Sequence, residues 1–435
     1  MLIPAPRFFW TAAALAIAGL GVSLFEVLAG AWLTGLGALI VFAFADAVLA
    51  LRLPVPAAER QMPGSLPVGV DHDIVIRLAS DAKHVLHLDA YDLHPPQTTV
   101  SGLPQSVKLP ARGWSEFSYL LRPIERGDIS FGRIQLRLRS PFGFWMVRRQ
   151  AGQAETVRVY PDFAKLTSFA LLAIDHRLSQ IGVLQRRRRG EGMDFHQLRE
   201  YREGDVQRQI DWKASARMQR VISRDYQDER DQQIILLLDC GRRMAARDDA
   251  LSHFDHVVNS ALLLAYVGLR QGDAVGLLTM SGPARWLAPR KSRATVNTIL
   301  NGVYDLQPTI SASDYHLAAL DLMQRVRKRA LVVVLSNLRD EDDDTLAPAL
   351  QLLRSRHLVL FASLRENILS RALATRVDNF DRAITHAAVA DYLHSRSRMF
   401  GRLEGMGAMC VDVEPEQLPI ALVNRYLEIK RRGQL

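Results

Sequence analysis

Three polar side chains in the middle of the chain, His196, Asp205 and Asp239, are of the types that enzymes use for proton transfer or metal binding. A carboxylate and an imidazole can act as general acid and base, and carboxylates can hold a divalent cation. A metal-dependent hydrolase or nuclease that uses these three residues is therefore one hypothesis. However, His196 and Asp205 are nine residues apart in a predicted loop, and that spacing specifies no catalytic geometry.

The short motifs of common catalytic and nucleotide-binding families are absent from the sequence. It contains no GxxxxGK[ST] phosphate loop, no GxSxG nucleophile motif, no HExxH zinc motif and no GxGxxG dinucleotide motif. The two cysteines, Cys240 and Cys410, cannot build a disulfide scaffold, and no His/Cys cluster offers a zinc site. We therefore expect a protein that is not an enzyme, needs no cofactor and keeps its thiols reduced.

A dense polar motif runs from Gly190 to Arg217, where arginines alternate with carboxylates beside aromatic side chains. Its candidate binding residues are Phe195, Arg199, Tyr201, Gly204, Asp205, Arg208, Asp211, Trp212, Lys213 and Arg217. Arginine forms planar bidentate pairs with carboxylates, and Trp and Tyr supply large contact areas at low entropic cost. The motif predicts either a partner-binding surface or an internal ion-pair network that joins two domains.

The spacing G-x-x-F-x-x-L-R-x-Y-x-x-G-D-x-x-R-x-I-D-W-K-x-S-A-R, which begins at Gly192, resembles the signature of the DUF58 family. In that family the signature leads into a von Willebrand factor A-like domain. Pro141-Phe-Gly143 and Val159-Tyr-Pro161 fit the resemblance as well. The resemblance implies a non-enzymatic adaptor that works with a MoxR-type AAA+ ATPase in the maturation or remodelling of client protein complexes. A structural component of an envelope system is a further alternative.

The resemblance also indicates where a metal ion would bind. A von Willebrand A domain usually supplies Asp-x-Ser-x-Ser after its first strand, a Thr in a second loop and an Asp after its fourth strand. Of these groups the first loop keeps only Asp239, and the other positions hold Gly241, Arg243, Ser313 or Asp314, and Asn337. One carboxylate, one hydroxyl and one amide carry too little negative charge for Mg²⁺. We expect a degenerate site (Asp239, Ser313 and Asn337) that binds no metal.

Alternating β and α segments are predicted to position these residues. Short, fully apolar strands alternate with helices in the last 200 residues, which is typical of a doubly wound α/β domain. The family resemblance implies that this domain is von Willebrand A-like. The expected strands are 234–238, 274–279, 331–335, 358–362 and 409–413, and the expected helices are 254–271, 296–303, 315–326, 346–354, 384–400 and 416–430.

Upstream of the motif, runs of alternating polar and apolar residues predict a small β-sandwich. These runs are 73–77, 84–88, 114–121, 133–139 and 157–160, separated by Pro, Gly and Asp turns. A helix is expected over 166–178. We divide the chain into a transmembrane hairpin (1–53), the β-sandwich (54–162), the signature segment (163–232) and the α/β domain (233–435).

The first fifty residues predict two transmembrane helices. The apolar stretch 8–51 is long enough for two spans, 8–25 and 32–51, with Glu26 and Gly30 at the turn. Arg7 and Arg52 flank the pair, so the positive-inside rule places both ends in the cytoplasm. We expect a multi-pass protein of the cytoplasmic (inner) membrane whose soluble domains face the cytoplasm; a cleaved signal peptide is the alternative.

Two charged features remain. Asp46 falls inside the second span, where we expect it near the interface, within reach of Arg52 or water, rather than in a partner contact or relay. The chain has 55 Lys+Arg against 46 Asp+Glu among 435 residues, and it contains the run 186–189 of four arginines. Such a run favours anionic lipid or an acidic segment. Nucleic acid is not expected, because stacking aromatics do not surround the run.

Overall fold

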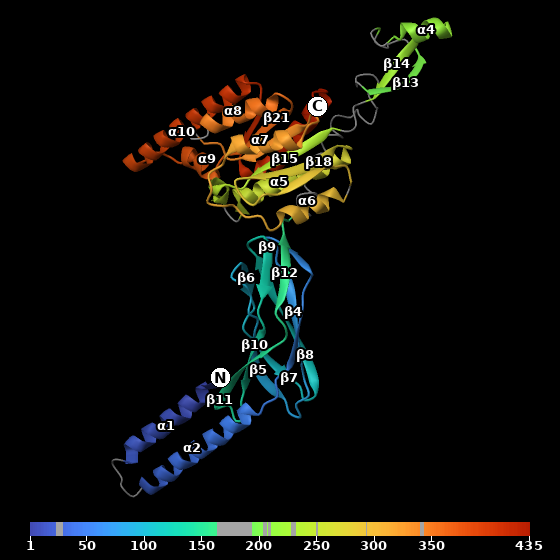
Figure 1. The fold of residues 1–435 in the computed structure, drawn as a ribbon. Coiled ribbons are helices and arrows are strands. Elements are labelled where there is room, and N and C mark those ends of the chain that lie inside the picture. The colour runs from blue at the N-terminus through green and yellow to red at the C-terminus, as the bar shows by residue number, and fades with distance from the viewer. Residues whose placement is uncertain are drawn as a thin grey trace. The chain divides into compact units, whose positions relative to one another are not determined.

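The computed structural model describes residues 1–22, 29–162, 194–202, 207, 210–227, 232–248, 251–292, 294–339 and 343–435. The chain forms two compact units, Met1–Tyr160 and Pro161–Leu435. The first combines two helices with β-sheets, and the second is built around an α/β sheet (Figure 1). A β-rich region is therefore followed by an α/β region.

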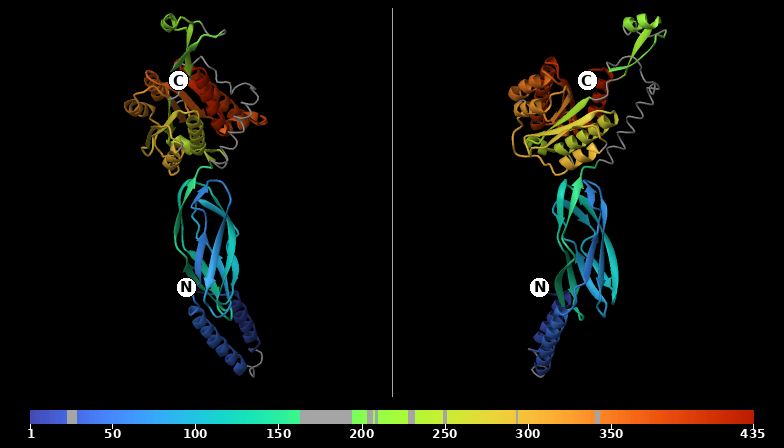
Figure 2. Two further views of the ribbon diagram at one scale, coloured as in Figure 1. Left: turned by 90° about the vertical axis from the view of Figure 1, so that its right-hand side faces the viewer. Right: turned by 45° about the vertical axis from the view of Figure 1, so that its right-hand side comes forward.

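Helices α1 (Pro6–Val22) and α2 (Ala29–Leu51) lie side by side (Figure 2). The Trp32 indole of α2 donates a hydrogen bond to the Leu15 carbonyl at 2.9 Å. Of the described helices, α2 alone is long and apolar enough to cross a membrane. The expected turn residue Gly30 lies inside α2, because the helix begins three residues before Trp32. Glu26 lies outside the described residues.

Twelve strands complete the first unit, in three sheets. Their order is β1-β11-β10-β5-β7, β2-β4-β8-β6 and β3-β12-β9. The bounds are β1 (Leu2–Pro4), β2 (Ala57–Gln61), β3 (Ser65–Pro67), β4 (His72–Ser80), β5 (Leu86–Tyr91), β6 (Thr98–Ser101), β7 (Gln105–Leu109), β8 (Gly113–Pro123), β9 (Gly127–Phe131), β10 (Ile134–Arg139), β11 (Trp145–Ala151) and β12 (Glu155–Tyr160). The predicted alternation appears in β4, where Ile74, Ile76 and Leu78 are buried. The strand expected over 84–88 instead runs from Leu86 to Tyr91.

The second unit contains a six-stranded sheet in the order β19-β18-β15-β20-β21-β22. Its strands are β15 (Gln233–Asp239), β18 (Ala274–Met280), β19 (Trp286–Arg290), β20 (Leu331–Ser336), β21 (Leu358–Leu364) and β22 (Met409–Val413). All neighbours pair in parallel except β18 and β19. Continuous burial of β15, β18 and β20 explains their unbroken apolar sequences.

Helices cover both faces of this sheet (Figure 1). They are α5 (His253–Arg270), α6 (Thr295–Val303), α7 (Tyr315–Arg325), α8 (Asp343–Arg354), α9 (Asn367–Ala374), α10 (Phe380–Gly405) and α11 (Leu418–Arg431). Leu236 belongs to one core cluster with residues of α5, α6 and α11, whereas Leu237 belongs to another with residues of α7, α8 and α10. Leu236 and Leu237 are successive residues of β15 and face opposite sides of the sheet. Helices therefore pack on both faces, as in a doubly wound fold.

Several elements of the second unit differ from the sequence expectation, and α10 extends beyond the predicted 384–400 at both ends. Strand β19 and helix α9 were not predicted, and the closing helix α11 starts at Leu418 after a short 3-10 turn, Pro415–Gln417. The helix expected over 166–178 lies outside the described residues. Near the start of the second unit, the signature segment forms β13 (Asp194–Glu200), α4 (Trp212–Met218) and β14 (Ile222–Gln227).

Candidate functional site

The carboxyl ends of the parallel strands hold the residues of the expected metal site. The chain passes from β15 to β18 on one side and later returns to β20 on the other, which makes the end of β15 a topological switch point. Asp239 ends β15 and is completely buried. Its carboxylate accepts hydrogen bonds from Ser313 Oγ at 2.7 Å, Ser336 Oγ at 2.5 Å and the Gly241 amide at 2.8 Å.

The first loop is too tightly packed for the serine that a metal site would need. A Cβ atom on Gly241 would lie 2.7 Å from Ser313 Oγ and 3.0 Å from Asp239 Oδ1. Of the three residues of the degenerate site, the structure therefore brings Asp239 and Ser313 together. In the structure, both carboxylate oxygens of Asp239 accept hydrogen bonds from the chain itself.

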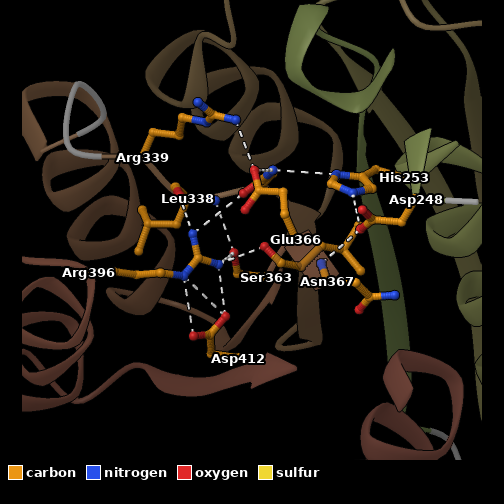
Figure 3. A network of polar contacts seen from close by, with 11 residues as sticks. Asp248, His253, Leu338, Arg339, Ser363, Glu366, Asn367, Arg396 and Asp412 are labelled. Carbon is orange, nitrogen blue, oxygen red and sulfur yellow. Dashed lines mark hydrogen bonds and ion pairs between the residues drawn. The ribbon is translucent and has the colours of Figure 1, made fainter. Parts of the chain in front are cut away.

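Asn337, the third residue of the degenerate site, contacts a neighbouring network of polar side chains. Figure 3 shows this network with His253, Glu366 and Arg396 labelled. The Asn337 amide nitrogen donates to Glu366 Oε1 at 3.0 Å and lies 3.5 Å from His253 Nδ1. The other ring nitrogen of His253 lies 3.0 Å from Asp248 Oδ2, and this carboxylate also accepts the Asn367 amide. Asn337 therefore serves to orient side chains from three other segments.

Arg396 of α10 is the centre of this network, with only 2% of its surface exposed. Its guanidinium donates to Ser363 Oγ at 2.7 Å, to the Leu364 carbonyl at 2.7 Å and to the Leu338 carbonyl. It also forms an ion pair with Asp412 of β22 at 2.8 Å. One arginine therefore fixes the ends of β20, β21 and β22 to helix α10.

In this network, hydrogen bonds and opposite charges together affect the pKa values of Glu366 and Arg396 more than burial does. Burial alone would raise the pKa of Glu366, but the hydrogen bond from Asn337 and the charges of Arg339 and Arg396 lower it below its usual value. Burial would likewise lower the pKa of Arg396, but the Asp412 hydrogen bond and charge raise it. Both groups are therefore held in their charged forms.

These contacts decide what the carboxyl edge of the sheet can do chemically. Its acids accept hydrogen bonds from hydroxyls, amides and guanidiniums of the same edge. In the part of the chain that the structure describes, no group of three or more His, Cys, Asp or Glu side chains is placed to hold a metal ion. The edge is built to hold strands and helices in place.

The signature segment has a different construction. Strands β13 and β14 form an antiparallel pair, and α4 lies between them in the sequence. Asp211 caps α4 by accepting the Lys213 amide at 3.1 Å and the Ala214 amide at 3.0 Å, and its other oxygen accepts Arg224 Nε at 2.9 Å. The Ala214 amide and then the Arg224 pair lower the pKa of Asp211. Asp211 therefore organises the segment itself.

Large apolar side chains of this segment face solvent. Trp212, the first residue of α4, has an exposed fraction of 71%, and Met218 at its end has 59%. Leu198 and Val221 are also exposed. Helix α4 buries none of its side chains, and Ser215 links it to β14 by accepting the Ile222 amide at 2.8 Å. Exposed aromatic and thioether side chains on a locally fixed helix are typical of a binding surface.

The other predicted binding residues of the signature lie partly on α4 and β13 and partly outside the described residues. Lys213 and Arg217 are exposed on α4, and Arg199 and Tyr201 are half-buried at the end of β13. The backbones of Phe195 and His196 lie in β13. Gly204, Asp205 and Arg208 lie outside the described residues, so the hypothesis of a catalytic Asp205–His196–Asp239 set remains a prediction.

Sequence reasoning missed the network around Arg396. Its members come from α5, β20, β21, α10 and β22, and no short motif connects them. Ser363, near the end of β21, and Glu366, two residues after it, carry a detectable signal, because polar residues at the carboxyl end of an apolar parallel strand lie at the ligand-facing edge of such sheets. Arg396 carries none, since it lies within a long helix rich in charged residues.

Residues 197–372 match the family described as "Protein of unknown function DUF58". The match covers all but the first five residues of the signature and every strand of the six-stranded sheet except β22, and it agrees with the resemblance noted from the signature spacing. No curated protein matches the chain.

Solved structures resemble only parts of the chain. An aerotolerance-related membrane protein from Bacteroides fragilis is 17% identical, with a TM-score of 0.24, over 30% of this chain and 67% of its own. Alpha-2-macroglobulin from Salmonella, reacted with methylamine, is 19% identical with a TM-score of 0.20, over 24% of this chain and 7% of its own. The chain thus spans less than a tenth of the macroglobulin, and similarities this low carry no functional argument.

Proposed function

We propose that this chain is a membrane-anchored, non-enzymatic adaptor that binds a MoxR-type AAA+ ATPase through the segment β13–α4–β14. In this role it would assist the maturation or remodelling of client protein complexes. The observation that carries the proposal is Trp212, which is 71% exposed at the start of a helix fixed by the Asp211 cap. A rigidly presented Trp is the residue type most often found at the energetic centre of protein interfaces.

The α/β unit supports the von Willebrand A-like part of this proposal. Numbered along the chain from β15, its sheet has the order 3-2-1-4-5-6 of a doubly wound domain. We propose that partner binding lies in the signature segment, where large apolar side chains are exposed. Any dependence on ATP would come from the partner.

Membrane anchoring is supported by α1 and α2. Helix α2 has 23 residues and is about 35 Å long, and the 17-residue α1 is about 25 Å long. A hydrocarbon core is about 30 Å thick, so we propose that both helices span it. Arg7 and Arg52 then place both chain ends in the cytoplasm. A reporter enzyme that is active only in the periplasm should be inactive when it is fused after Leu435. Activity of this fusion would contradict the proposed topology.

A pair of tryptophan variants tests the binding role. The full chain, purified in detergent, is immobilised and titrated with a MoxR-type ATPase from the same organism. Trp212→Ala should weaken binding about 30-fold or more, which corresponds to the roughly 2 kcal/mol of an interface hot spot. Trp114→Ala is the matched control, because Trp114 is 53% exposed on β8 of the other unit.

The outcomes separate the parts of the proposal. Binding by the native chain and by Trp114→Ala, together with loss in Trp212→Ala, supports the adaptor and its surface. Equal binding by all three would reject the signature segment as the contact. If the native chain binds no such ATPase, the adaptor proposal itself fails.

A further inference from the structure

A buried carboxylate lies within the apolar helix α2. Asp46 is five residues from the end of α2 and has no exposed surface. The sequence predicts an aspartate near the interface, within reach of Arg52 or water; the hydrogen bonds of the described residues show donors from another part of the chain. The Asp46 carboxylate accepts Ser140 Oγ at 2.6 Å, the Phe142 amide at 3.2 Å and the Phe144 amide at 3.1 Å. These donors come from the turn between β10 and β11.

The turn, Ser140–Trp145, is shaped to receive this carboxylate. While Ser140 Oγ donates to Asp46, it accepts the amides of Gly143 at 3.1 Å and Trp145 at 3.0 Å. Gly143 has φ +80°, a backbone conformation that residues with a Cβ rarely adopt, and this turns the flanking amides toward Asp46. The Trp145 indole donates to the Ala43 carbonyl of α2 at 2.8 Å.

Aromatic side chains extend the contact between the turn and α2. The rings of Phe42 and Phe142 lie 4.6 Å apart, and those of Phe42 and Phe144 lie 5.6 Å apart. Phe42 and Phe142 nevertheless remain 43% and 47% exposed. They thus form one apolar surface shared by a helix of membrane-spanning character and a β-turn.

Further contacts hold the helices and the β-sheets together. The N-terminal strand β1 pairs with β11, directly before α1 begins. After α2, the Leu51 carbonyl accepts a hydrogen bond from Arg149 of β11 at 2.9 Å. Figure 2 shows α1 and α2 leaving the β-rich region at this end.

We propose that the Ser140–Trp145 turn lies in the lipid–water interface, where it binds Asp46 and presents Phe142 to the lipid. The inference rests on the proposed membrane anchoring and adds a lipid contact to the β-rich region. Phe42 is nine residues, or about 13 Å, from the end of α2. With the turn in the interface, the last nine residues of α2 lie outside the hydrocarbon core, and the adjoining Phe142 lies at its edge. Asp46 is one of these nine residues, and because it is buried its carboxylate needs donors, of which the turn provides three.

Depth-dependent fluorescence quenching tests the position of the turn. The full chain carrying Phe142→Cys is labelled with a thiol-reactive fluorophore and placed in lipid nanodiscs that contain nitroxide lipids. Ser130→Cys is the control, because exposed Ser130 is separated from the turn by β10, about 20 Å of strand. The native thiols should label slowly, since Cys240 is buried and burial raises the pKa of Cys410 to about 12.

Nitroxide lipids should quench the label at position 142 at least threefold more than the label at position 130. Equal quenching at the two positions, in a chain that stays in the nanodisc, would overturn the interfacial turn while leaving membrane anchoring intact. A chain that does not enter the nanodisc would overturn both.

The role of Asp46 is tested in the same background. Asp46→Leu removes the acceptor and should reduce quenching at position 142 toward that at position 130, because the turn is released. Asp46→Asn retains a carbonyl acceptor and should stay close to the native aspartate. Unchanged quenching in Asp46→Leu would show that the turn does not depend on this carboxylate and would reject that part of the proposal.

Discussion

The carboxyl edge of the six-stranded sheet and the signature segment are both rich in charged residues, but they use them in opposite ways. At the sheet edge Asp239 and Arg396 are buried, and their partners come from distant segments of the chain. In β13–α4–β14 the ion pairs Arg220–Glu200 and Arg224–Asp211 are local, and large apolar side chains are exposed.

This difference assigns the sheet edge to the stability of the fold and the signature segment to the recognition of a partner. Buried polar networks lose several kcal/mol when one partner is removed, whereas exposed pairs contribute little. Exposed Trp and Met side chains gain energy only when a partner covers them. We therefore expect substitutions at the sheet edge to change unfolding and substitutions in the signature segment to change binding.

The largest effect is expected for Arg396→Ala. Removing the guanidinium leaves Asp412 and two strand-end carbonyls without their buried donor, so unfolding of the α/β unit should become easier by about 3–5 kcal/mol. Thermal denaturation of the purified full chain measures this. Arg382→Ala on the same helix is the control, because its ion pair with Asp378 is exposed and its loss should leave the melting temperature unchanged. Equal melting of the two variants would contradict the comparison.

Gly241→Ser should have the next largest effect. The substitution supplies a serine expected in a metal site, but its Cβ would lie 2.7 Å from Ser313 Oγ, so overpacking should cost about 1–3 kcal/mol. Calorimetry should detect no Mg²⁺ binding by this variant or by the native chain. Gly401→Ser on α10 has open space around its Cβ and serves as the control. A stable variant that binds one Mg²⁺ would overturn our view of the loop.

A smaller effect is expected from acidification. Because the folded chain lowers the pKa of Glu366, folding favours its ionised form. This contribution is present above the ordinary glutamate pKa of about 4.3 and is lost as the pH falls through the lowered value. Melting temperature measured from pH 7 down to 3.5 should therefore fall less steeply in Glu366→Gln than in the native chain. Parallel curves would show that Glu366 is not part of this linkage.

The sequence predicts the framework of the α/β unit better than its polar contacts. The runs 234–238, 274–279 and 331–335 are unbroken and apolar because the strands are covered on both faces, and each lies within an observed strand. Strand β19 was not predicted from the sequence, because it is an antiparallel edge strand that contains Pro289 and lacks polar–apolar alternation.

Polar contacts could be predicted only where they are local or follow a strand. The resemblance to a von Willebrand A-like domain grouped Asp239 and Ser313 in one degenerate site, and the structure shows a hydrogen bond between them that the sequence did not predict. The Asp46 contact could not be found, because its donors lie 94 to 98 residues away and two of them are backbone amides. A sequence does not show which backbone amides will donate to a distant side chain.

The smallest change in stability, and the sharpest test of the comparison, is expected at Asp211. Asp211→Ala removes the acceptor for the Lys213 and Ala214 amides, so the first turn of α4 should open more often. Amide hydrogen exchange over residues 212–218 should become several-fold faster, while the α/β unit keeps its melting temperature. Asp211→Asn is the matched variant, because asparagine caps helices as well as aspartate but cannot form the ion pair with Arg224. If Trp212 must be presented by an ordered α4, Asp211→Ala should also weaken ATPase binding and Asp211→Asn should largely retain it. If Asp211→Ala binds the ATPase as strongly as the native chain, Trp212 does not need an ordered α4 for binding. If Asp211→Ala instead lowers the melting temperature of the α/β unit, the signature segment contributes to the stability of that unit.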